Sequence, residues 1–133
     1  MVVIPKSLYE EMLAHARGEY PNECCGLLAG RNGTVTKVYR MTNTHHSPVS
    51  YFMDAKEQFA VFKEMRTEGS DLVAIFHSHP HTQAYPSKTD VGLAYYPEAL
   101  YIIISLQDRN PAVNAFRIVD GIITREEFSI QPS

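Results

Sequence analysis

The segment from Leu72 to His79 constrains the fold more than any other part of the chain. Five consecutive apolar residues, Leu72 to Phe76, predict a buried strand, and two histidines, His77 and His79, follow it. Residues two positions apart on a strand point to the same side of a sheet. The sequence therefore predicts two imidazoles that face one point at the end of a buried strand.

A serine and an aspartate follow this strand at a spacing that suits a metal site. Ser87 is expected to open a helix with Asp90 on its first turn, so the full pattern is H-x-H-x7-S-x2-D. Two nitrogen donors and one oxygen donor are typical of catalytic zinc, which leaves its fourth position to water, whereas structural sites take four ligands. Taken separately, the histidines also fit ordinary hydrogen-bonded side chains, and Ser-x-x-Asp also fits a plain helix capping box. Their combination directly after an apolar strand favours a catalytic metal site.

The composition is that of an ordinary soluble domain and argues against several classes of partner. The 133 residues are 44% hydrophobic and 20% charged, which predicts one domain, residues 1–133, with a core that needs no disulfide. A formal net charge of -3 provides no basic surface for nucleic acid. The apolar runs are too short to cross a bilayer and no secretory pattern opens the chain, so we expect no membrane partner. Cys24 and Cys25 are adjacent and fit neither a structural disulfide nor a C-x-x-C motif, so we expect them in the core of a cytoplasmic protein.

Hydrophobic periodicity and turn signals predict the order of the elements. Helices are expected at 6–20, at 55–68 and from Ser87 onward, and strands at 23–29, 34–41, 72–79, 100–106, 112–119 and 122–130. Asn32-Gly33 and Asp120-Gly121 are typical of tight hairpin turns. This order predicts an α/β (α+β) fold in which a mixed sheet carries about three helices.

An apolar stripe is predicted on each of the two later helices. It consists of Phe59, Phe62 and Met65 on the helix that Asp54 is expected to cap, and of Val91, Leu93 and Ala94 on the helix that begins near Ser87. We expect the first of these stripes to pack in the core rather than to bind a cofactor.

A hydrolase built on this metal also needs a group that moves a proton from the attacking water to the leaving amine. Glu23 is the only acid at the end of a buried strand before the metal segment, although a solvated carboxylate is the simpler interpretation of the pattern alone. Ser87, beside Asp90, is placed to donate a hydrogen bond to a developing oxyanion. His45 and His46 are adjacent in a polar loop, and we expect them to be exposed rather than to bind metal.

Together these residues resemble the motif of the JAMM (MPN+) metalloprotease family. Glu23 ahead of Cys-Gly-Leu-Leu, then His77-x-His79-Pro, Ser87 and Asp90 match that motif position for position, and the similarity covers nearly the whole chain. The resemblance implies a cytidine-deaminase-like sandwich around a curved sheet, and hydrolysis of amide or isopeptide bonds after the C-terminal glycine of ubiquitin-like proteins. It implies His77, His79 and Asp90 as ligands of one Zn²⁺ per chain with water as the fourth ligand, Glu23 as general base and acid, and Ser87 as the oxyanion helper.

Within that family the chain is most similar to the bacterial Mec-type peptidases of sulfur metabolism. The similarity lies in residues 23–30, 47–54, 85–91 and 116–121. It implies, as partner, a small ubiquitin-fold sulfur-carrier protein with a Gly-Gly C-terminus, from which cysteine is released by cleavage of the Gly-Cys amide. The flexible tail would enter a groove beside the zinc as an extended chain, and we expect the polar loop 42–53 to line that groove.

Two other functions stay open at this point. A broader deubiquitinase-like or carrier-processing protease would remove peptides instead of cysteine, although the chain lacks the long insertions of the eukaryotic deubiquitinating members. A non-catalytic scaffold or binding module would keep the motif without turnover. A zinc deaminase is excluded, because the chain has no H-x-E with P-C-x-x-C.

Overall fold

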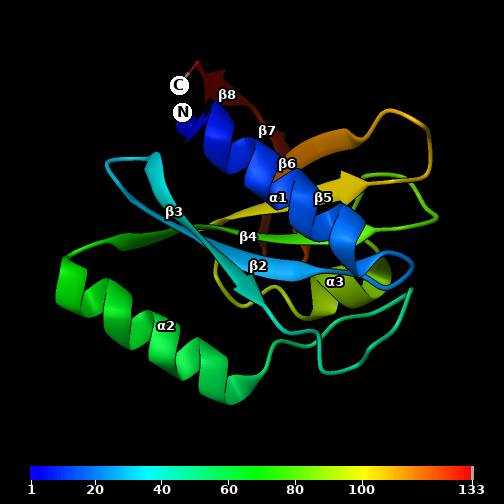
Figure 1. Cartoon of the computed structure of the whole chain (residues 1–133), viewed down its shortest axis with the longest axis horizontal. Helices are drawn as coiled ribbons and strands as arrows, with labels where there is room; N and C mark the ends of the chain where they lie inside the picture. Colours follow the sequence, from blue (N-terminus) through cyan, green and yellow to red (C-terminus); the bar gives the residue numbers. More distant parts are fainter. Residues whose placement is uncertain (133) are drawn as a thin grey trace.

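An eight-stranded mixed sheet forms the centre of the computed structural model, which describes residues 1–132 (Figure 1). Its strands are β1 (Val2–Pro5), β2 (Cys25–Arg31), β3 (Thr34–Met41), β4 (Asp71–His79), β5 (Leu100–Ser105), β6 (Ala112–Val119), β7 (Ile122–Glu126) and β8 (Phe128–Gln131). The helices are α1 (Lys6–Glu19), α2 (Ala55–Glu68) and α3 (Lys88–Gly92). None of these helices is long and apolar enough to span a membrane.

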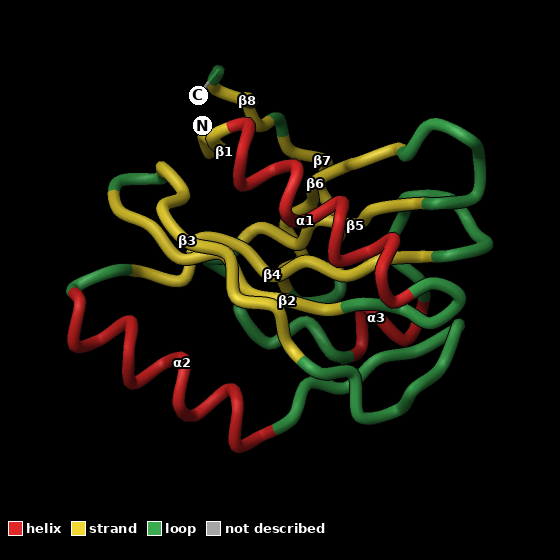
Figure 2. The backbone as a smooth tube through the Cα atoms, in the orientation of Figure 1, coloured by secondary structure: helices red, strands yellow, loops and turns green. Residues whose placement is uncertain are grey.

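The sheet is strongly curled. Its strand order is β7-β6-β5-β4-β2-β3-β1-β8, so β7 and β8 lie at opposite edges, yet only Glu127 separates them along the chain. The two edges must therefore approach each other. β8 pairs in parallel with β1, which brings the two ends of the chain together (Figure 2). The curved mixed sheet predicted from the sequence is thus confirmed.

Apolar clusters cover both faces of the sheet. On one face α1 packs through Met12 against Phe76 of β4. On the opposite face Met65 of α2 and Val91 of α3 pack with a cluster that contains Ile75. Neighbouring residues of β4 thus alternate between the two faces, as the strand period requires. From Ala74 onward the odd-numbered positions of β4 face α2 and α3, whereas Leu72 packs with the α2-side cluster and Val73 with the α1-side cluster.

The local signals that were read from the sequence form the expected turns and caps. The side chain of Asp54 accepts a hydrogen bond from the backbone N–H of Lys56 and so caps α2. Asn32 and Gly33 have φ values of 52° and 79°, and Asp120 and Gly121 have 51° and 79°. Positive φ at both central residues is the type I′ geometry that matches the twist of a β-hairpin.

The strands predicted from the sequence were wrong in three places. The N-terminal strand β1 was not expected, because its four residues pair only with strands that are distant in sequence. The single strand predicted over 122–130 is two strands, since the chain leaves β6 after Glu126 and joins β1 at the other edge. β2 begins at Cys25, so Glu23 lies just before the strand rather than in it.

Two predicted apolar stripes were also partly wrong. Phe59 is 71% exposed, and Met65 is the only fully buried residue of α2, because this helix meets the sheet mainly at β3 and β4. α3 has only five residues, and Leu93 is its C-cap and is 38% exposed. Hydrophobic spacing gives the side of a helix that is apolar, but the angle at which the helix crosses the sheet decides how much of that side is covered.

Gly26 lies on β2 at a point where a side chain would collide with the core. A Cβ there would be 2.2 Å from Cζ of Phe76 and 2.7 Å from the backbone oxygen of Tyr39. We expect Gly26→Ala to lower the free energy of unfolding by about 3 kcal/mol, measured by urea denaturation. The matched control is Gly18→Ala in α1, where a Cβ meets nothing within 4 Å and a gain of about 0.5 kcal/mol is expected. A Gly26→Ala variant as stable as the wild type would contradict the packing of Phe76.

Candidate metal centre and active site

The end of β4 presents two buried histidines on one face of the sheet. His77 is paired with Cys25 of β2 on one side and with Ile103 of β5 on the other. His79 ends the strand, and the two residues are 1% and 4% exposed. Their Nε2 atoms lie 3.1 Å apart. The strand period therefore brings both imidazoles to one point, as predicted.

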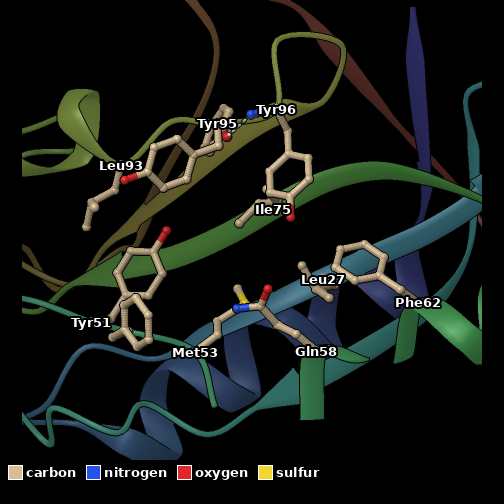
Figure 3. Close-up of a pocket in the computed structure, with 11 residues that line it drawn as sticks. Leu27, Tyr51, Met53, Gln58, Phe62, Ile75, Leu93, Tyr95 and Tyr96 are labelled. Carbon is tan, nitrogen blue, oxygen red and sulfur yellow. Dashed lines mark hydrogen bonds between the residues drawn. The ribbon is translucent and has the colours of Figure 1, made fainter. Parts of the chain in front are cut away.

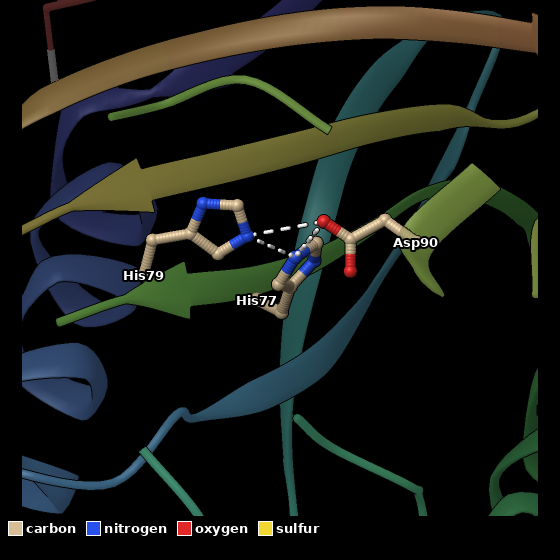
Figure 4. Close-up of side chains that lie close together, drawn as sticks. All are labelled: His77, His79 and Asp90. Carbon is tan, nitrogen blue, oxygen red and sulfur yellow. Dashed lines mark hydrogen bonds and ion pairs between the residues drawn. The ribbon is translucent and has the colours of Figure 1, made fainter. Parts of the chain in front are cut away.

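The first turn of α3 adds a carboxylate to this point. Ser87 Oγ accepts a hydrogen bond from the Asp90 N–H at 3.1 Å, and the Ser87 N–H donates to Asp90 Oδ2 at 2.8 Å. The same Oδ2 lies 3.2 Å from His77 Nε2 and 3.0 Å from His79 Nε2 (Figure 4). The capping box thus orients the carboxylate towards the histidines, so the two interpretations of Ser-x-x-Asp are compatible.

The three atoms fit a tetrahedrally coordinated cation. Their separations of 3.0 to 3.2 Å are close to the edge of about 3.3 Å that metal–ligand distances of about 2.0 to 2.1 Å require. His79 Nδ1 lies 2.8 Å from the Gln83 carbonyl oxygen, and donation there leaves Nε2 unprotonated in the neutral ring. An imidazole lone pair and a carboxylate oxygen then face each other at 3.0 Å, and they repel unless a proton or a metal cation lies between them. His77, His79 and Asp90 are therefore placed so that their ligand atoms could hold one metal ion.

The three groups differ in how the site shifts their pKa values. Burial lowers the pKa of His77. Burial also lowers that of His79, but the hydrogen bonds to Asp90 and to the Gln83 carbonyl outweigh it and leave its pKa raised. Burial acts to raise the pKa of Asp90, and the hydrogen bonds from His77 and His79 overcome it and hold the pKa well below its usual range. Protons therefore compete with a metal at the imidazoles and not at the carboxylate.

We expect the affinity for Zn²⁺ to fall as the pH is lowered, since an imidazole binds a metal only when it is neutral. Because the pKa of His79 is raised, the competition should begin above the ordinary histidine value and weaken binding by about tenfold per pH unit below it. Titration against a fluorescent chelator between pH 8 and pH 5 measures this. An affinity that stays constant over that range would contradict a histidine ligand.

Glu23 lies opposite His79 and on the same face. The Cys24 N–H donates to Ser78 Oγ at 2.7 Å, and the Ser78 N–H donates to the Cys24 oxygen at 3.1 Å. These bonds extend the pairing of Cys25 with His77 by one residue, so the next pair along is Glu23 with His79. Directly opposed residues of antiparallel strands point to the same side. Glu23 thereby joins the site although it precedes the strand itself.

The carboxyl group of Glu23 is buried and incompletely hydrogen-bonded. The residue is 4% exposed, and its Oε1 has no hydrogen-bond partner within residues 1–132. Burial raises its pKa to about 8, opposed by the charge of His79 and reinforced by that of Asp90. A carboxyl group with a near-neutral pKa is suited both to accept and to donate a proton. The solvated interpretation of Glu23 was therefore wrong.

The other residues considered in the sequence fall into two groups: Ser87 lies at the metal cluster, and the adjacent histidines and cysteines lie outside it. Ser87 Oγ accepts from the Asp90 N–H, and its hydroxyl proton donates to none of the described residues. His45 lies outside the metal cluster and bonds instead to Ser50 Oγ, while His46 is exposed. The two cysteines are free thiols in the core, and burial raises the pKa of Cys24 to about 12 and that of Cys25 still further. Their assignment to core packing is confirmed.

An aromatic side chain lies against the site, a contact that the sequence pattern did not predict. The ring of Tyr51 stacks on that of His77 with centroids 4.6 Å apart. Tyr51 also lines an apolar pocket of about 190 Å³ between the start of α2 and the segment after α3 (Figure 3). The other residues around it are Leu27, Phe52, Met53, Gln58, Phe62, Ile75, Leu93, Tyr95, Tyr96 and Tyr101. No spacing rule distinguishes Tyr51 from the other tyrosines, because the path of the loop alone brings it to His77.

Comparison with known proteins decides the family. The family described as prokaryotic homologs of the JAB domain matches residues 5–119. The chain belongs to this family. The JAMM resemblance inferred from the motif is thereby confirmed.

This JAB-domain protein has closely similar relatives over almost its full length. It is 41% identical over 133 residues to the CysO-cysteine peptidase of Mycobacterium tuberculosis, covering 98% of this chain and 91% of the relative. It is 35% identical over 122 residues to the probable TtuB-protein conjugate cleaving protease of Thermus thermophilus, covering 91% of this chain and 78% of the relative. The prediction of a JAMM-type peptidase is confirmed by these matches.

Solved structures support the same fold. A protein from Desulfitobacterium hafniense superimposes with a TM-score of 0.90 at 41% identity, covering 100% of this chain and 94% of its own. A JAB1/MPN domain protein from Archaeoglobus fulgidus superimposes with a TM-score of 0.67 at 19% identity, covering 98% of this chain and 100% of its own. The second match shows the fold alone, and it confirms the predicted sandwich class.

Proposed function

We propose that this JAB-domain protein is a zinc-dependent peptidase that cleaves the amide bond after the C-terminal glycine of a ubiquitin-fold sulfur-carrier protein and releases cysteine. The observation that carries the proposal is the convergence of His77, His79 and Asp90 with buried Glu23 opposite them. The name of the mycobacterial relative, CysO-cysteine peptidase, supports this substrate. One Zn²⁺ per chain and a cytoplasmic location belong to the proposal, and the two free thiols are in keeping with a reducing compartment.

The proposed zinc ligands are His77, His79 and Asp90. Zinc bound there would lower the pKa of a water ligand towards neutrality and polarise the carbonyl of the scissile amide. The protein itself orients the donors, since Gln83 accepts from His79 Nδ1 and the Ser87 N–H donates to Asp90. Such outer contacts fix the tautomer and the direction of each ligand before the metal arrives.

Glu23 is the proposed general base and general acid. It takes a proton from the attacking water and passes it to the nitrogen of the leaving cysteine as the amide bond breaks. Its free Oε1 and its raised pKa support both roles. Ser87 is the proposed oxyanion helper, because its hydroxyl proton is available to the carbonyl oxygen as negative charge develops there.

The carrier tail is proposed to lie along the loop 42–53. Tyr51 of this loop stacks on His77, and Phe52 and Met53 line the apolar pocket beside it, which supports the loop as one wall of the groove. Shortening the loop is expected to raise KM for the carrier. Unchanged cleavage of a carrier fusion by the shortened protein would refute this role.

Three substrates test the proposed function with the purified, zinc-loaded protein. They are a carrier that ends in Gly-Gly-Cys, the same carrier extended by a longer peptide, and the carrier joined to a lysine by an isopeptide bond. We expect mass spectrometry to record loss of one cysteine from the first substrate at a rate well above cleavage of the other two. Absence of cleavage in all three would contradict a peptidase.

A broader conjugate-cleaving protease is the second candidate function. It is favoured by the Thermus relative, whose name is that of a TtuB-protein conjugate cleaving protease. It predicts isopeptide cleavage at a rate similar to or above cysteine release. The ratio of the two rates therefore separates the two candidates.

A further inference from the structure

The backbone of Glu23, and not its carboxylate, holds this side chain in place. Oε1 has no hydrogen-bond partner among the described residues. The Glu23 N–H donates to the Ser47 carbonyl oxygen at 2.8 Å, and the Glu23 carbonyl accepts from Asn43 Nδ2 at 3.0 Å. Both partners belong to residues 43–52, named here the site loop. The position of the proposed general base therefore depends on this loop.

One buried amide organises the site loop. Asn43 is 7% exposed, and its Nδ2 donates to the Ser50 carbonyl at 3.0 Å as well as to Glu23. Its Oδ1 accepts from the His45 N–H at 3.0 Å and from the Phe52 N–H at 3.1 Å. Two donors and two acceptor positions are the full capacity of an asparagine side chain. Asn43 thus closes the loop on itself and ties it to Glu23 through the same group.

The loop also contacts the metal site directly. Tyr51 lies between Ser50 and Phe52, both of which bond through their backbones to the Asn43 side chain, and its ring stacks on His77. A bridge between Asn43 and Met53 holds the two ends of the loop together. The loop therefore reaches the backbone of Glu23 and the ring of His77 from one continuous segment, and Asn43 bonds both to Glu23 and to the two chain neighbours of Tyr51.

We propose that Asn43 is a positioning residue that sets the place of Glu23 for proton transfer. This inference rests on the proposed role of Glu23 as general base and adds a residue that the JAMM resemblance did not supply. No other side chain reproduces the contacts, since aspartate lacks the donors and glutamine places its amide one methylene further out. A displaced base slows proton transfer while the tail and its groove stay intact.

Asn43→Ala is expected to lower kcat by about 10- to 100-fold with KM changed less than about threefold. Steady-state cleavage of the carrier–cysteine substrate measures both constants, at a temperature well below the unfolding transition of each variant and with equal zinc content. A residue that only maintained the fold or the groove would change KM or stability and leave kcat unaltered.

A double-mutant cycle with Glu23→Gln tests the link itself. Once the base is gone its position no longer matters, so Asn43→Ala is expected to lower single-turnover cleavage less than about twofold in the Glu23→Gln background. Equal losses in the two backgrounds would overturn the proposal. Independently of activity, hydrogen exchange of the Glu23 amide is expected to quicken at least about tenfold in Asn43→Ala, and an unchanged rate would also overturn it.

Two further variants distinguish a loss of kcat at the site from a loss caused by misfolding. In Asn43→Ser the hydroxyl can still accept from the His45 N–H, a turn contact between residues two apart, but it is too short to reach the Glu23 carbonyl. It should fold readily and show the same loss of kcat, and a normal kcat would count against the proposal. Val35→Ala removes buried volume from β3 in the cluster under α1, and it should lower stability while keeping kcat.

The outcomes separate this inference from the proposed function. A wild-type protein without turnover, or a Glu23→Gln variant with full turnover, would contradict the proposed function. Suppose instead that the wild type turns over and Glu23→Gln does not. An unchanged kcat in both Asn43 variants would then contradict only the assignment of Asn43.

Discussion

Glu23→Gln is expected to lower kcat for release of cysteine from the carrier by about 100- to 10,000-fold, because proton transfer by a positioned side chain contributes that much. The amide has the size of the carboxyl group, so the fold should be kept, and Glu23 is not among the three grouped ligand residues, so the zinc content should be kept as well. Single-turnover mass spectrometry with the zinc-loaded protein measures the loss. Turnover within threefold of the wild type would remove Glu23 from the mechanism, and it would leave the metal site unaffected.

The same substitution is expected to stabilise the metal-free protein at neutral pH. Burial raises the pKa of Glu23 from 4.5 to about 8, so the unfolded chain releases this proton at a lower pH than the folded one. Between those two pH values the stability that Glu23 contributes falls as the pH rises. Glutamine does not titrate, so Glu23→Gln should unfold at a higher temperature than the wild type at pH 7, and the difference should shrink towards pH 4. Thermal scans in the presence of a chelator test the sign.

Loss of one metal donor is expected to have the second large effect. His77→Ala should weaken zinc binding by more than about 100-fold, because loss of a residue that only supports a ligand already costs up to about 100-fold. The variant should also lose cleavage. Zinc at 100 times its Kd should add about 2.7 kcal/mol to the free energy of unfolding of the wild type, and almost nothing to that of the variant at the same concentration. Thermal unfolding with added zinc and with a chelator measures the shift.

His81→Ala is the matched control for zinc binding. His81 follows His79 at the same interval as His79 follows His77, but it is exposed, contacts Tyr20 and lies outside the metal cluster. Its removal should leave the zinc-dependent shift unchanged. Equal loss of the shift in His77→Ala and His81→Ala would show that the stabilisation does not come from the proposed ligands.

Much of the metal centre could be predicted because it depends on short-range rules. The strand period aligns His77 with His79, and the capping box that opens α3 fixes Asp90 in a known relation to Ser87. The Asn32-Gly33 and Asp120-Gly121 turns follow from the same kind of local chemistry. The position of Glu23 could not be predicted from local pattern alone. Glu23 is far from the histidines in sequence, and only the pairing of β2 with β4 brings it opposite His79.

The errors share one physical origin. The strand β1 and the break between β7 and β8 depend on pairing with distant strands, and the exposure of Phe59 depends on where α2 crosses the sheet. None of these is encoded in the residues nearby. Asn43 could not be predicted for the same reason. Its side chain makes four hydrogen bonds, one with Glu23 and three with residues of its own loop, and no local pattern in this polar segment indicates them.

The sequence by itself determined the donor types, their spacing and the two turns that fix the hairpins, because each depends on residues within a few positions of one another. Only the tertiary structure decided that a buried carboxyl faces those donors, that Tyr51 stacks on one of them, and that one asparagine holds the backbone of Glu23. Those contacts join segments 20 or more residues apart, as between Glu23 and Asn43. They exist only because the curled sheet brings β2, β4 and the site loop to the same place.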